Sequence, residues 1–166
     1  MGVADLRARA LARTRDAVLR LSLCLDEALV AELQEASASY SRARAHGEDD
    51  PDFDSAEVAA IEVARLQDLA EDATVVLTFR RLDPAGYDQL VHDHSTDGRV
   101  DPAGFYPALC RACYLSASSI DGESLELSWD DLEGRVLSHG DRDHLSTAVL
   151  THNRASSILP TGTRRP

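Results

Sequence analysis

The N-terminal part of the chain has a pattern of apolar positions that is typical of a long helix. No Pro or Gly interrupts residues 4–45, and Leu11, Val18 and Leu25 recur at a spacing of seven residues. The pattern predicts one helix from about residue 4 to residue 45, which would be roughly 60 Å long at 1.5 Å per residue. A small globular domain cannot cover a helix of that length, so we expect it to pair with another helix.

A second helical pattern follows an acidic, Pro-containing turn. Residues 54–57 resemble a capping box, in which Glu57 reaches back to Asp54. The apolar positions after this cap predict a helix to about Asp72: Val58, Ile61, Val63, Leu66 and Leu69. We expect the two helices to form an antiparallel hairpin over residues 1–73, with the first helix associating with other copies of the chain as the open alternative.

The period of the pattern changes after the hairpin. Residues 74–79 are apolar and rich in β-branched side chains, which predicts a short strand. No other segment has a comparable strand pattern. A single strand cannot satisfy its own backbone groups, so we expect it to pair with a weak partner such as 125–127, or with another chain.

The second half of the chain contains residues that typically begin and end short helices. The sequence Asp-Pro-Ala-Gly followed by an aromatic residue occurs twice, at 83–87 and at 101–105. In each copy the Asp is a helix cap and the Pro fits the first helical position, which predicts helices over 84–94 and 102–115. A polar, Gly-containing loop is expected next, over 116–123.

Two more helices are predicted after that loop. Ser128 is expected to cap a helix that ends near Ser138, and Asp141 to cap one that ends near Asn153. The whole pattern predicts a mainly α fold with an antiparallel helical hairpin and a compact four-helix domain containing one short strand. The expected divisions are 1–73, 74–155 and a flexible tail over 156–166.

The composition is typical of closely packed helices, and the net charge argues against some classes of binding partner. Hydrophobic residues make up 43% of the chain and aromatics only 5%, with Ala and Leu dominating. The formal charge is −12, which argues against binding to nucleic acid. No secretory signal and no bilayer-spanning apolar run is apparent, so we expect no membrane association and a cytoplasmic location.

The only cluster suggestive of chemistry combines two cysteines and two histidines. Cys110 and Cys113 form a C-x-x-C, and His92 and His94 lie upstream, as zinc ligands would. The cysteines fall on an apolar helical stripe, however, which favours a place in the core. A zinc site and a redox pair stay as alternatives. No nucleophile elbow, dinucleotide fingerprint or phosphate-binding loop is present, so we expect no catalytic residue, no cofactor, no resident metal and no enzymatic activity.

The order of elements in the second half resembles a known family. An extended 75–82 segment leads to a Tyr87-x-x-Leu90 helix, then to Phe105-Tyr106-Pro107-Ala108-Leu109, then to Trp129-Asp130-Asp131-Leu132 and a last helix ending in Thr151-His152-Asn153. This order, from about Val75 to Ile158, resembles the tail assembly chaperones of siphophages and prophages from actinobacteria.

The resemblance implies a function without catalysis. Proteins of that family bind the tape measure protein in the host cytoplasm, keep it soluble and help to recruit tail tube subunits. We expect the following residues to contact such a client: Leu11, Val18, Leu25, Leu29, Phe79 and Phe105. The alternatives are a structural head–tail or virion protein, and a small zinc-binding regulator or metal-dependent hydrolase.

Overall fold

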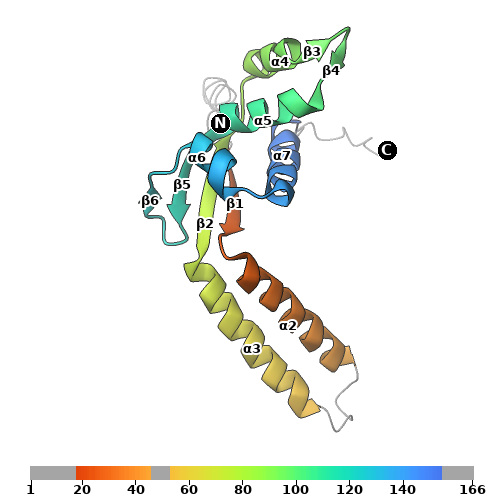
Figure 1. Ribbon diagram of the computed structural model, residues 1–166, viewed down its shortest axis with the longest axis vertical. Coiled ribbons are helices and arrows are strands. Elements are labelled where there is room, and N and C mark those ends of the chain that lie inside the picture. The colour runs from red at the N-terminus through yellow and green to blue at the C-terminus, as the bar shows by residue number, and fades with distance from the viewer. Residues whose placement is uncertain (1–17, 46–52, 155–166) are drawn as a thin grey trace, which may run out of the picture. The chain divides into compact units, whose positions relative to one another are not determined.

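The computed structural model describes residues 18–45 and 53–154, and it contains a β-sheet that the hydrophobic pattern did not predict (Figure 1). Four strands form an antiparallel sheet in the order β1-β2-β5-β6. Two further strands, β3 and β4, form a separate small hairpin. The predicted mainly α fold is therefore wrong, and the protein is an α+β mixture.

Strand β1, Val18–Cys24, replaces the middle of the predicted long helix. Leu19, Leu21 and Leu23 are partly buried, whereas Arg20 and Ser22 between them are exposed. This alternation has the period of two that belongs to a strand with one covered face. The prediction of a continuous helix over residues 4–45 is wrong for this segment, and its first part lies outside the described residues.

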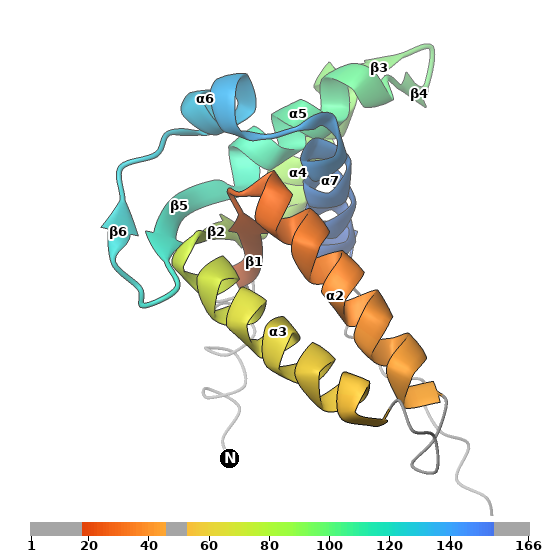
Figure 2. The same cartoon turned by 60° about the horizontal axis from the view of Figure 1, so that its bottom comes forward.

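The helical hairpin itself is present, in a shorter form. Helix α2 spans Glu27–Ala45 and helix α3 spans Phe53–Asp72, and the two lie side by side (Figures 1 and 2). Asp26 caps α2, because its carboxylate accepts the Leu29 N–H at 3.0 Å. At the base of the hairpin the Leu25 N–H donates to the Ala73 carbonyl at 2.9 Å.

The predicted strand over 74–79 is confirmed as β2, Thr74–Arg80. Its neighbours are β1 and β5, Tyr114–Ser119, so the expected pairing with 125–127 is wrong. Strand β6, Ser124–Leu125, pairs instead with β5, with Ala117 opposite Leu125. The loop expected over 116–123 is consequently a strand for its first half.

The repeated Asp-Pro-Ala-Gly motif begins two helices, as predicted. Helix α4 spans Pro84–Asp93 and helix α5 spans Pro102–Cys113. The Asp83 carboxylate accepts the Gly86 N–H at 2.7 Å, and the Asp101 carboxylate accepts the Gly104 N–H at 3.2 Å. The Gly of each copy thus donates to the cap, and in the second copy the Ala103 N–H also donates to the Asp101 carboxylate, at 3.1 Å.

A tight hairpin separates α4 from α5. Strands β3, Ser95–Thr96, and β4, Arg99–Val100, are joined by Asp97 and Gly98. Both turn residues have positive φ, 54° and 75°, which is the geometry of a type I′ turn. An Asp-Gly pair between short strands is a recognised signal for such a turn, but the flanking residues are too polar and too few to give a strand pattern.

The last helices begin at serine caps. Helix α6, Trp129–Asp131, runs directly into a π-helical turn, η1, Leu132–Val136. Ser128 caps α6 as predicted, in a reciprocal box with Asp131. Helix α7, His139–Arg154, is capped by Ser138, whose hydroxyl oxygen accepts the Asp141 N–H at 3.2 Å while Asp141 accepts the Ser138 N–H at 3.0 Å. The prediction of Asp141 as the cap is therefore wrong.

The chain divides into two compact units. One contains residues 78–115 and 128–154, and its core is built on aromatic and aliphatic side chains: Phe79, Phe105, Leu109, Trp129, Leu132, Leu145 and Val149. The other contains residues 20–45, 53–77 and 116–127, that is, the hairpin and much of the sheet, with a smaller core: Ala56, Leu66, Val75, Leu77 and Ala117.

Candidate functional site

The residues expected to contact a client fall into two groups. Val18 and Leu25, at the two ends of β1, are 49% and 50% exposed, and Leu29 on α2 is half-buried. Phe79 and Phe105 have exposed fractions of 0% and 1% and belong to the core. Leu11 lies outside the described residues. The structure therefore does not bring the five described residues together on one surface.

Phe79 is held by an aromatic cluster. Its ring meets Tyr114 at a centroid distance of 5.9 Å and Trp129 at 6.1 Å, both edge to face. Phe105 makes a similar contact with Tyr87, at 6.0 Å. The contacts of Phe79 hold α6 and the start of β5 to the strand β2, and the contact of Phe105 with Tyr87 holds α4 to α5.

The C-x-x-C lies in the core, as its position on the apolar stripe predicted. Cys110 and Cys113 have exposed fractions of 2% and 0%. The Cys110 Sγ lies 3.8 Å from the Ser146 Oγ, and the Asn153 side-chain amide donates to the Cys113 Sγ at 3.3 Å. Burial raises the pKa of the Cys110 thiol to about 11, and burial also raises the pKa of Cys113. Both thiols are therefore protonated at neutral pH, which is the unreactive form.

The histidines do not extend this pair into a metal site. His92 is exposed at the end of α4, whereas His94 is half-buried against the start of α5. In the ranges 18–45 and 53–154, no group of three or more His, Cys, Asp or Glu side chains is arranged to hold a metal ion.

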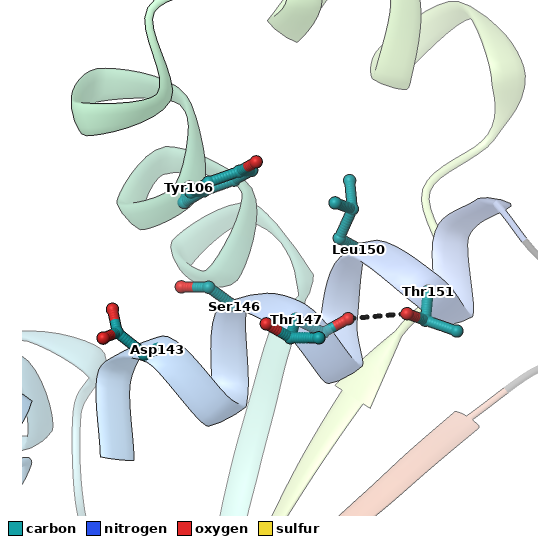
Figure 3. A pocket seen from close by; sticks show the side chains of 6 residues that line it. All are labelled: Tyr106, Asp143, Ser146, Thr147, Leu150 and Thr151. Carbon is teal, nitrogen blue, oxygen red and sulfur yellow. Dashed lines mark hydrogen bonds between the residues drawn. The ribbon is translucent and has the colours of Figure 1, made fainter. Parts of the chain in front are cut away.

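One shallow depression lies between α5 and α7 (Figure 3). Its volume is about 210 Å³, and Tyr106 faces it from α5 while five residues line it from α7: Asp143, Ser146, Thr147, Leu150 and Thr151. Small-molecule sites typically hold about 300–1,000 Å³ and enclose most of the ligand. The Thr151 hydroxyl donates to the Thr147 carbonyl at 2.8 Å, so it is already satisfied within the helix. The depression has neither the size nor the convergent polar groups of a ligand site.

A polar cluster on the surface of the same unit has a structural role. Arg111 on α5 lies 2.6 Å from Asp130 and 3.0 Å from Glu133, and the Trp129 indole N–H also donates to Glu133 at 3.1 Å. The Arg111 and Asp130 side chains are largely exposed, and such pairs contribute little to stability. The hydrogen bond to Glu133 holds the indole ring of Trp129 at the edge of the core.

Known proteins offer no template for any of these features. No family model, curated protein or solved structure matches this chain. No helix among the described residues is long and apolar enough to cross a membrane. The function has to be argued from the surfaces of the chain itself.

The surface with the most exposed apolar side chains is on α3. Val58 is 67% exposed, Ile61 is 64% exposed and Leu69 is 44% exposed. All three are among the apolar positions that predicted this helix, together with Val63 and Leu66. In the structure the latter two are the more buried: Leu66 is 2% exposed and Val63 is half-buried. The sequence pattern therefore identified these residues as apolar helix positions, without indicating which face of α3 they occupy.

Proposed function

We propose that this protein is a tail assembly chaperone, a binding protein that keeps a tape measure protein soluble while a phage tail is built, and that it performs no catalysis. The proposal has two supports. One is the resemblance of the segment from Val75 to Ile158, and the other is the helical hairpin with its exposed apolar residues on α3.

The hairpin is the observation that carries the proposal. Helix α2 has no fully buried residue, and α3 exposes three large apolar side chains over three turns. A monomeric protein rarely leaves such a row in water unless a partner covers it. A client with long amphipathic helices is the kind of partner that a helical hairpin accepts, since apolar side chains repeat at the same spacing on both sides.

The core of the other unit supports a binding role in a different way. Its Phe79, Phe105 and Trp129 side chains are buried, and its two central thiols are buried and protonated. Ser128 and Asp131 cap a helix, and Arg111 and Asp130 form an exposed ion pair. The described chemistry of this unit is that of a scaffold.

Co-expression tests the proposed function. The protein would be produced together with the long coding sequence, periodic in apolar residues, that the family resemblance places next to its gene. We expect the large protein to remain in the supernatant and to co-purify with the chaperone. An unrelated acidic protein of similar size is the control. A large protein that stays insoluble in both cases, or the presence of this chain in finished particles by mass spectrometry, would contradict the proposal.

A further inference from the structure

Helix α3 has two apolar faces, and the hairpin uses only one of them. Helix α3 packs against α2, and its buried and half-buried residues include a row spaced by three and four along the chain, which we call the inner face: Ala56, Ala59, Val63, Leu66 and Ala70. Half-buried residues of α2 recur with the same spacing: Leu29, Leu33, Ala36, Tyr40 and Ala43. Such a spacing is that of two helices packed along a shared seam. The hairpin is therefore complete without the second face of α3.

The second face forms what we call the outer row, which consists of Val58, Ile61, Arg65 and Leu69. At 100° per residue these four positions lie within about 80° of one another, on the side of α3 opposite Val63. Their spacing of three, four and four residues is again that of a helix seam. From Val58 to Leu69 the row is roughly 16 Å long, which is enough for two to three turns of a partner helix.

Charge identifies the kind of helix that fits. Helix α3 contains six acidic residues and one basic residue, Arg65, so its formal charge is −5. Glu57 and Asp68 lie along one side of the outer row, Glu62 lies along the other, and Asp72 lies in line with the row beyond Leu69. Arg65 is engaged by Glu62 through two bonds of 2.9 and 2.7 Å. The rim therefore presents uncompensated negative charge.

The same charge argues against a second copy of this chain as the occupant. Two α3 helices laid along each other would bring −5 against −5 around a short apolar row. Like charges directly opposite one another oppose association, and this effect adds to the net −12 of each chain. A helix with Lys or Arg beside its apolar stripe has the opposite effect, because each cation meets a carboxylate of the rim.

We propose that the outer row of α3 is the docking site for a basic amphipathic helix of another protein. Leu or Ile side chains of that helix pack on Val58, Ile61 and Leu69, and its Lys or Arg side chains meet Glu57 and Asp68. This inference rests on the proposed function in taking the protein to bind a protein client, and it adds where the client binds and which charge it has.

A synthetic peptide is a direct probe of this site. The peptide would have about three heptads, with Leu at the a and d positions and Lys at the e and g positions. Binding of the labelled peptide to the full chain would be followed by fluorescence anisotropy at low and at physiological salt. A peptide of identical composition, with its Leu and Lys positions shuffled so that no stripe forms, controls for charge alone.

Two variants separate the apolar row from the acidic rim. In the first, V58S/I61S, we expect at least a tenfold loss of affinity, since two largely exposed aliphatic contacts are removed. In the second, E57Q/D68N, we expect a loss of several-fold that disappears at high salt. Val100→Ser is the matched control, because Val100 is also an exposed aliphatic residue but lies in the other unit. Circular dichroism would show that each variant is folded.

The possible outcomes test the docking site and the proposed function separately. Equal binding of the striped and shuffled peptides, or unchanged binding to V58S/I61S, overturns the outer row as a docking site. A wild-type dimer that V58S/I61S converts to a monomer in sedimentation would assign the row to a second copy and also overturn it. If the peptide binds at the row but co-expression fails to solubilise the tape measure protein, the site stands and the proposed client is wrong. If co-expression succeeds in V58S/I61S as in wild type, the function stands and the site is wrong.

Discussion

The side chain of Asn153, near the end of α7, accepts the backbone N–H of Leu82 at a distance of 2.9 Å. Leu82 lies just beyond β2, 71 residues away in the sequence. The amide nitrogen of the same side chain donates to the Val149 carbonyl at 2.8 Å and to the Cys113 Sγ at 3.3 Å. One half-buried side chain thus links α7, α5 and the exit from the sheet, and it uses both its acceptor and its donors to do so.

Asn153→Ala removes this link and leaves the Leu82 N–H without its partner. We expect the free energy of unfolding to fall by about 1–3 kcal/mol, the usual cost of an orphaned, partly buried polar group. Urea denaturation at pH 7 measures it. Asn153→Asp keeps the acceptor for Leu82 but loses the donor to Val149 and Cys113, so its loss should be smaller than that of the Ala variant. Thr151→Ala, an exposed position in the same turn, should change stability by no more than about 0.5 kcal/mol.

Much of this arrangement could be predicted from the sequence, but not the contact itself. Caps and turns depend on neighbours in the chain, so Asp83, Asp101 and Ser128 were identified correctly as caps. Which distant N–H an Asn at the end of a helix will accept depends on how elements pack, and no local pattern encodes that. In the sequence, Asn153 stands out only as the end of the last helix in the segment that resembles the tail assembly chaperones.

The prediction of a helix over residues 18–24 is wrong because two hydrophobic periodicities overlap in that segment. Leu11, Val18 and Leu25 suggest a heptad, whereas Leu19, Leu21 and Leu23 alternate with polar residues as a strand does. The absence of Pro and Gly favoured the helix, yet the segment forms β1 because β2 offers it a ladder of backbone partners. Strand β5 was missed for a different reason. Half of its residues are Ser, and only the tertiary environment of Ala117, which is completely buried, makes it a central strand.

The sequence alone also does not indicate which apolar row of α3 is free for docking. The sequence of α3 contains two apolar rows, and either could face α2. The choice depends on the direction in which the chain leaves the turn before α3 and enters β2, which is a property of the fold. An apolar residue on a helix therefore indicates an interface without indicating whether the partner is inside or outside the chain.

The three cysteines should differ strongly in their reactivity toward a disulfide-exchange reagent. Cys24 in β1 is only partly buried, whereas Cys110 and Cys113 are fully enclosed and their pKa values are raised by burial. In the native protein at pH 7.5 we expect one thiol to react readily, and the other two only after denaturant is added. Cys24→Ser should abolish the fast reaction. Equal rates for all three thiols would contradict the burial of the C-x-x-C.

Alkaline pH should destabilise the protein through Cys110. Its pKa rises from 9.0 in the unfolded chain to about 11 in the folded one. The folded state therefore holds the proton more tightly, so this contribution is complete below pH 9 and is lost as the pH rises from 9 to 11. Two pKa units correspond to roughly 2–3 kcal/mol. Burial raises the pKa of Tyr114 and Cys113 as well, so part of the slope remains without Cys110.

Cys110→Ala separates the contribution of this thiol from the others. The variant should be less stable than wild type at pH 7, because a small buried side chain is truncated. The fall in its free energy of unfolding between pH 8.5 and 11 should nevertheless be shallower than that of wild type. Urea titrations at a series of pH values measure both quantities. Parallel pH profiles for the two proteins would show that Cys110 does not titrate in this range in a manner coupled to folding.

The two copies of the Asp-Pro-Ala-Gly motif should respond in opposite directions to the same substitution. At Gly86 an added Cβ would lie 3.3 Å from the Asp83 carboxylate oxygen, the end of an exposed side chain that can shift slightly. At Gly104 it would lie 3.0 Å from the His94 Nδ1 and 3.1 Å from the Asp101 Oδ2, so two side chains would have to move at once. Ala favours a helix over Gly by about 0.5–1 kcal/mol. We therefore expect Gly86→Ala to be neutral or slightly stabilising, and Gly104→Ala to be destabilising by about 1 kcal/mol.

The double variant G104A/H94A, which removes one of the two obstacles, should recover part of the loss relative to His94→Ala alone. Thermal and urea unfolding of the five proteins would test this, and a Gly104→Ala variant as stable as Gly86→Ala would show that the close approach of His94 to α5 does not hold in solution.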